Sequence, residues 1–151
     1  MTYLWWALLI FLSFFLQSRI SVLGVSPDLT VLLVYYAGIK YGETRGLLSG
    51  VLIGALEDGL SSFIIGPNLL GKGMIGFSAA FFVSGGFFRW TPLLGMIAVS
   101  FFTVFDNAVV FLSRTMFDKM PAAPSSALFI TVMQSVMNAL AGIFMRPQHV
   151  D

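Results

Sequence analysis

A single segment sets the architecture of this chain: residues 46–68, which read GLLSGVLIGALEDGLSSFIIGPN. Its apolar run predicts a transmembrane helix over about 46–65. Glycine recurs at every fourth position, at Gly46, Gly50 and Gly54, and at about 100° per residue these positions share one helix face. Small residues at this spacing let a second backbone approach closely. We therefore expect this face to pack against another helix, either within the chain or from a partner.

Two acidic residues, Glu57 and Asp58, continue this face at its far end. A carboxylate inside a membrane costs about 2.5 kcal/mol or more unless it meets a partner or water. Because adjacent acids repel each other, we expect one of the two to carry a proton. The helix breakers Gly66 and Pro67 then reverse the chain, and Lys72 follows one turn into the next helix. We predict an ion pair between Lys72 and one of these acids, which either holds helices together or lines a binding cavity.

The composition of the whole chain is typical of a membrane protein. Of its 151 residues 58% are hydrophobic and 10% are charged, and the mean hydropathy is +0.92. A soluble domain with so little surface charge would aggregate. The apolar residues form six runs, so we expect one all-α domain over residues 1–151, built as a bundle of six transmembrane helices. The expected spans are about 2–18, 28–40, 46–65, 69–88, 93–113 and 127–145.

Polar and small side chains also occur in the last three spans. Side-chain amides four residues apart on the sixth span can hydrogen-bond a carboxylate on a neighbouring helix. We expect a polar clamp between the fifth and sixth spans, with the floor of a ligand cavity as the alternative. The small residues of the fourth span predict a second packing face. The positions concerned are Gly76, Ala80, Asp106, Asn107, Gln134 and Asn138.

Several functional classes find no support in the sequence. Eight basic residues nearly balance seven acidic ones, so no basic field indicates a nucleic-acid partner. Cysteine is absent, which removes disulfides and thiolate chemistry, and the one histidine, His149, lies close to the last residue. No nucleophile–base pair, metal-ligand spacing or phosphate-binding loop is visible. We therefore expect no enzymatic activity, no metal and no cofactor.

Two motifs link the chain to a known family. Pro27-Asp28-Leu29 opens the second span, and the series Gly46, Gly50, Gly54, Asp58 precedes Gly66-Pro67-Asn68-Leu69. In both motifs the chain resembles the rod shape-determining protein MreD family. Members of that family are small proteins of five or six spans with almost no soluble mass, so the similarity in layout covers essentially the whole chain. Glu57 departs from the pattern, in which an apolar residue is expected before the aspartate.

The resemblance implies a role in assembly and no catalytic activity. It implies a non-enzymatic component of the cell-elongation (rod) complex in the bacterial inner membrane, which supports cell shape and sidewall peptidoglycan synthesis. An MreC-like single-span protein would dock on the small-residue faces of the third and fourth spans. MreB, RodA and a class B penicillin-binding protein would belong to the wider complex. Membrane lipid and a second copy of the chain are further expected partners.

A second resemblance supplies an alternative function. The chain looks similar to the substrate-binding S components of energy-coupling-factor vitamin transporters, which are also small six-helix bundles with glycine-rich spans.

The distribution of charged residues predicts the orientation of the chain in the membrane. With six spans both termini lie on one side, and a slight excess of basic residues in the loops of that side places it in the cytoplasm.

Overall fold

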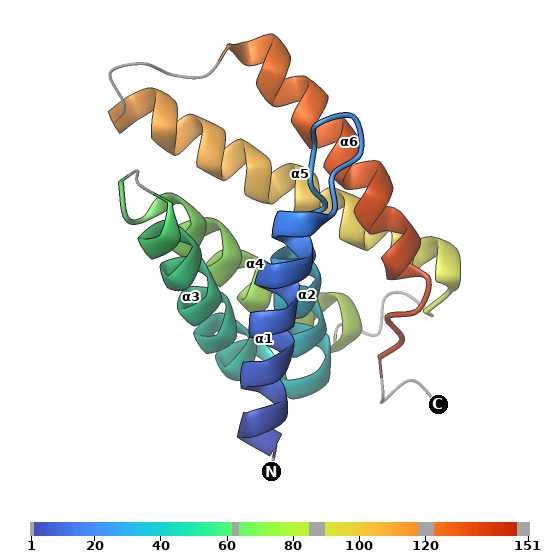
Figure 1. Cartoon of the computed structure of the whole chain (residues 1–151). Coiled ribbons are helices and arrows are strands. Elements are labelled where there is room, and N and C mark those ends of the chain that lie inside the picture. The colour runs from blue at the N-terminus through green and yellow to red at the C-terminus, as the bar shows by residue number, and fades with distance from the viewer. Residues whose placement is uncertain (1, 62–63, 85–89, 118–122, 148–151) are drawn as a thin grey trace.

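The computed structural model describes residues 2–61, 64–84, 90–117 and 123–147. Within these ranges the regular structure is all helical, as predicted, apart from one isolated bridge between Val22 and Val25. Figure 1 shows the six helices of this part of the chain. They are α1 (Thr2–Arg19), α2 (Leu29–Tyr41), α3 (Glu43–Leu60), α4 (Pro67–Ser84), α5 (Pro92–Phe117) and α6 (Pro124–Gly142).

The ends of α3 and the start of α4 differ from the predicted spans. α3 begins three residues early, at Glu43, because Gly42 has a φ of 85° and lets the chain reverse directly after α2. It ends at Leu60 instead of 65, where Ser61 takes an extended backbone conformation. α4 begins at Pro67 and not at 69, since proline is tolerated in the first turn of a helix.

The other helices are close to their predicted positions. α1 and α2 each end one residue later than predicted, and α2 begins at Leu29 because Asp28 is its N-cap. α5 continues to Phe117, beyond the predicted end at 113. α6 is displaced toward the N-terminus, with Pro124 at its first turn and its end at Gly142. Residues 85–88 of the predicted fourth span lie outside the described residues.

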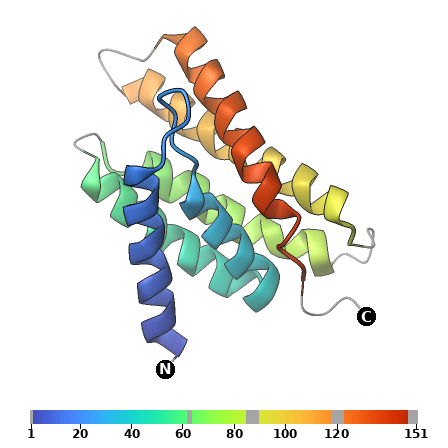
Figure 2. The ribbon, with the colours of Figure 1, turned by 45° about the vertical axis from the view of Figure 1, so that its right-hand side comes forward.

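α2 is the centre of the bundle. It has only 13 residues, yet it contacts all five other helices. Figure 2 shows it between the α3–α4 pair and the α5–α6 pair, with α1 packed along it. The rings of Tyr35 on α2 and Phe102 on α5 lie 5.6 Å apart in the core. The buried residues of α2 are Thr30, Val31, Leu32, Val34, Tyr35, Ala37, Gly38 and Ile39.

Glycines allow the backbones of α3 and α4 to touch. A Cβ atom built on any of the three predicted glycines of α3 would collide with a backbone carbonyl of α4. The two small-residue faces therefore pack against each other, and the expectation that they receive a partner's helix is wrong, because the same chain already fills that surface. The close contacts pair Gly46 with Gly76, Gly50 with Lys72 and Gly54 with Asn68, and Ala80 is buried further along α4.

The length and the apolar content of each helix indicate whether that helix could cross a membrane. Among the described residues, α5 and α6 are the helices long and apolar enough to cross a membrane. α1 and α2 are apolar but offer shorter apolar stretches. α3 carries charged residues near both ends and α4 contains Lys72, which lowers the hydropathy of both helices. By these two criteria the prediction of six spans is supported only for α5 and α6.

Replacing Gly50 with alanine should destabilise the protein. The new methyl group would collide with the Lys72 carbonyl and force α3 away from α4, and overpacking of this kind costs about 1–3 kcal/mol. A thermal melt of the purified protein should show a lower unfolding temperature. Gly59→Ala is the matched control on the same helix, because nothing lies within 4 Å of a Cβ built there. Identical melting curves for Gly50→Ala and the wild type would contradict this packing.

Candidate functional site

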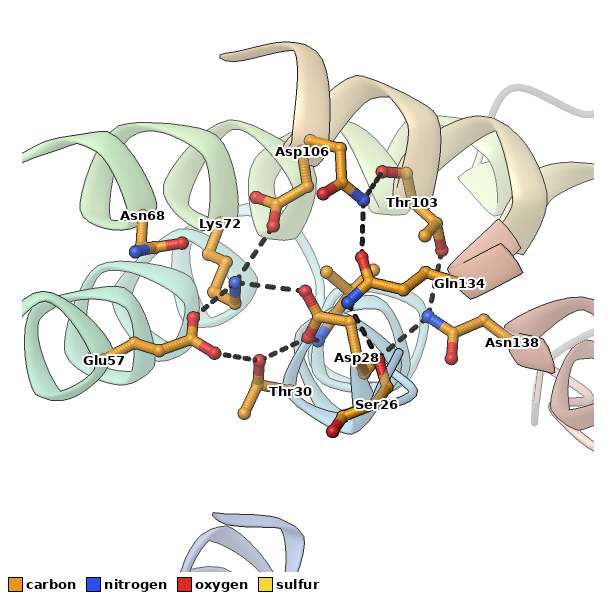
Figure 3. Close-up of polar contacts among 12 residues, drawn as sticks. Ser26, Asp28, Thr30, Glu57, Asn68, Lys72, Thr103, Asp106, Gln134 and Asn138 are labelled. Carbon is orange, nitrogen blue, oxygen red and sulfur yellow. Dashed lines mark hydrogen bonds and ion pairs between the residues drawn. The ribbon is translucent and has the colours of Figure 1, made fainter. Parts of the chain in front are cut away.

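Lys72 lies in the interior of the bundle, and its side chain is 0% exposed. Its Nζ atom is 3.0 Å from Asp106 Oδ2 and 3.6 Å from Asp28 Oδ2, and it forms a third ion pair with Glu57 Oε2. Figure 3 shows the three carboxyl groups converging on this nitrogen from different elements of the chain. These four residues, Asp28, Glu57, Lys72 and Asp106, are called the Lys72 cluster below.

The helix ends explain how the Lys72 cluster forms. Glu57 lies in the last turn of α3 and Lys72 in the second turn of α4, so the antiparallel hairpin sets them side by side. Asp28 is the N-cap of α2, where its Oδ1 accepts a hydrogen bond from the Val31 amide at 3.1 Å. The cap thus places a carboxyl group at the centre of the bundle, because α2 itself is central.

Asp106 comes from the middle of α5. It reaches α4 beside Gly71, where a Cβ atom would lie 2.5 Å from Asp106 Oδ1. The sequence placed Asp106 in a clamp between the fifth and sixth spans. The structure directs it instead to Lys72 on α4, and the neighbouring Asn107 makes the contact with α6.

Asp58 does not pair with Lys72. Its carboxylate accepts hydrogen bonds from the backbone amides of Gly66 (2.8 Å), Leu69 (3.0 Å) and Asn68 (3.2 Å), and from Asn68 Nδ2 (2.8 Å). It therefore binds the free amides at the start of α4, where a negative charge is favourable. Successive helix residues point about 100° apart, which explains why Glu57 meets the lysine and Asp58 meets the turn.

The amides of α6 bind neutral groups, whereas the sequence led us to expect a carboxylate. Gln134 Oε1 accepts from Asn107 Nδ2 at 2.8 Å, and Gln134 Nε2 donates to the Ser26 carbonyl at 2.9 Å. Asn138 Nδ2 lies 3.0 Å from the Asp28 carbonyl and 3.1 Å from Thr103 Oγ1. The clamp between α5 and α6 is present, and it also holds the loop before α2.

Thr30 is a member of this network that the sequence did not single out. Its hydroxyl oxygen lies 2.6 Å from Asp28 Oδ1 and 3.1 Å from Glu57 Oε1, and the residue is fully buried (Figure 3). A threonine in the first turn of an apolar helix, two residues after an N-cap aspartate, was the available signal. Such residues more often bond their own backbone, as Thr131 does with Ala127.

The chemistry of the Lys72 cluster is that of charge pairing. Three carboxyl groups surround one ammonium group, so acidic groups outnumber the basic one. In the part of the chain that the structure describes, no group of three or more His, Cys, Asp or Glu side chains is arranged to hold a metal ion. The cluster joins α3, α4 and α5 to the start of α2.

Lys72→Met should unfold or strongly destabilise the protein. Methionine keeps most of the apolar stem but removes the ammonium group, and breaking a buried ion pair by removing one partner costs about 3–5 kcal/mol. The measurement is again the unfolding temperature, with Lys40→Met as control, because Lys40 contacts Tyr36 and Tyr41 away from the cluster. A Lys72→Met protein as stable as Lys40→Met would show that the buried ammonium is not needed.

No family model matches this chain, and no match was found among curated proteins or solved structures.

Proposed function

We propose that this chain is a multi-pass protein of the bacterial inner membrane and a non-enzymatic component of the cell-elongation complex. The observation that carries the membrane assignment is the distribution of polarity. Charged and amide side chains meet inside the bundle, whereas large apolar side chains cover its outside. Lipid accepts such a surface, while water does not.

The exposed apolar residues recur along the outer faces of the helices. Leu48 is 63% exposed on α3, Ile97 is 56% exposed on α5, and Val136 is 61% exposed on α6. One helical turn further along, Leu52 on α3 and Leu140 on α6 are exposed as well. An apolar surface that continues over several helices fits a bundle surrounded by acyl chains.

The length of the shorter helices is compatible with this assignment. α2 rises only about 20 Å, but as the buried centre of the bundle it does not need to face lipid along its whole length. α3 rises about 27 Å, and its charged residues lie in its first and last turns, which leaves Gly46 to Leu56 without charge. Snorkelling of end residues and local thinning of the bilayer accommodate such lengths at small cost.

The link to the elongation complex comes from the resemblance to the MreD family. The matching residues occupy positions on which the packing of this chain depends. Pro27 is buried beside the α2 cap, Asp58 binds the start of α4, and the glycines of α3 lie against α4. Glu57, the residue that departs from the family pattern, pairs with Lys72. An MreC-like helix would then meet the outer apolar faces, held by close van der Waals packing.

Cysteine labelling tests the membrane assignment. The natural chain has no cysteine, so each single-cysteine variant reports one position without background. Leu52→Cys should react poorly with a water-soluble maleimide in membranes, because lipid covers that face. Thr44→Cys, exposed in the first turn of the same helix, should react quickly and serves as control. Rapid labelling at both positions in membranes would contradict an embedded bundle.

Affinity purification in mild detergent tests the proposed role. The tagged full-length chain should co-purify an MreC-like single-span protein together with RodA and a class B penicillin-binding protein. An unrelated multi-pass protein with the same tag is the control. A tightly bound vitamin together with an ATPase module would favour the transporter alternative. Recovery of the chain without elongation proteins would overturn the proposed role and leave the membrane assignment to the labelling experiment.

A further inference from the structure

The Thr30 hydroxyl touches two carboxyl groups, and it has only one hydrogen to give. Its oxygen lies 2.6 Å from Asp28 Oδ1 and 3.1 Å from Glu57 Oε1. A hydroxyl group supplies one donor and two lone pairs. If both acids were ionised, one of these contacts would join two acceptor oxygens with no hydrogen between them. Both contacts can be hydrogen bonds if one of the two carboxyl groups is protonated and donates to the Thr30 oxygen.

The surrounding charges lead to the same requirement. With every member ionised, the Lys72 cluster would hold three negative charges and one positive charge, offset only by about half a charge at the start of α2. Asp106 is 2% exposed, and its Oδ1 is buried without a hydrogen-bond partner. A buried oxygen of this kind shows that the cluster has fewer positive groups and donors than its acids need. One added proton removes one of the excess charges.

The hydrogen bonds decide which acid holds that proton. Asp28 Oδ1 already accepts from the Val31 amide and lies closest to the Thr30 hydroxyl, so it is the better acceptor for the one hydrogen of Thr30. Asp58, next to Glu57 on α3, accepts its hydrogen bonds at the start of α4 as an anion. A hydrogen on Asp106 Oδ1 would face no acceptor. Glu57 Oε1 faces the Thr30 oxygen as well, so once the Thr30 hydrogen points to Asp28, a hydrogen on Glu57 Oε1 would meet a lone pair of that oxygen.

We propose that Glu57 binds a proton and donates it from Oε1 to the Thr30 hydroxyl oxygen, which makes the Lys72 cluster a proton-binding site within the bundle. The hydrogens then run in one direction, from Glu57 to Thr30 and from Thr30 to Asp28. Glu57 Oε2 remains free to accept from Lys72. The Glu57 side chain is 17% exposed, more than any other member of the cluster, so this proton can exchange with the surroundings.

The bound proton links two helices. It joins Glu57 on α3 to Thr30 on α2, and its release would leave two like charges, on Glu57 and Asp28, on either side of one hydroxyl group. Lys72 and Asp106 are the other charged groups that face Glu57 in the cluster. Release of the proton therefore weakens the contact between α2 and α3.

Isotope-edited infrared spectroscopy tests the proposal without altering the cluster. Glu43 and Glu57 are the two glutamates of the chain, so a Glu43→Gln protein grown with ¹³C-carboxyl glutamate carries its label at Glu57 alone. At neutral pH we expect a protonated carboxyl band with the ¹³C shift that moves in deuterium oxide and disappears in alkaline buffer. A purely ionised signal from the labelled group would overturn the proposal. A protonated band without the ¹³C shift would also overturn it, because the proton would then reside on an aspartate.

Two variants give a second measurement. Glu57→Gln replaces the protonated acid by a neutral donor of similar shape and should keep the wild-type unfolding temperature at neutral pH. The wild-type unfolding temperature should fall as the pH is raised, and that of Glu57→Gln should fall less. Thr30→Val removes the acceptor, so the labelled band should disappear at a lower pH than in the wild type. Strong destabilisation of Glu57→Gln at neutral pH would contradict the proposal, because Lys72 would then require the ionised glutamate.

Discussion

A lysine ammonium cannot remain buried among apolar helices unless acidic groups surround it, and this requirement organises the bundle. Lys72 is enclosed completely, so three elements must each direct a carboxyl group toward it. The start of α2, the end of α3 and the middle of α5 are thereby held at fixed distances from α4. Burying these charges away from water costs free energy. The same burial favours this one arrangement of the helices, since a shift of any one helix would leave a charge unpaired.

The glycine contacts and the Lys72 cluster depend on each other. Because Gly50 and Gly54 have no side chains, α3 can approach α4 closely enough for Glu57 to reach Lys72. Gly71 does the same for Asp106 on the α5 side. Small residues and charged residues, which look like separate features along the sequence, are thus two parts of one packing arrangement. The glycines set the distance between the backbones, and this short distance lets the charged side chains reach each other.

The arrangement also bears on function. Most polar side chains of the helices are engaged with other parts of the chain, and what remains outside is largely apolar. The proposed role in assembly would use this outer surface. The proton proposed at Glu57 adds a way for the surroundings to influence that shape, because it lies at the contact between two helices and not at a surface loop.

Several features followed from the amino-acid sequence alone. The apolar runs and the helix breakers predicted six helices and their approximate limits, because periodicity and turn residues act over short distances along the chain. The glycine spacing predicted a packing face, and Lys72 called for an acidic partner. The identity of these partners came only from the tertiary structure. Asp28 and Asp106 are 44 and 34 residues from Lys72, and no local pattern shows that they converge on it. The same reason explains the errors: Asp106 was expected to meet α6 but pairs with Lys72 on α4, and the surface that we assigned to a partner is filled by the chain itself.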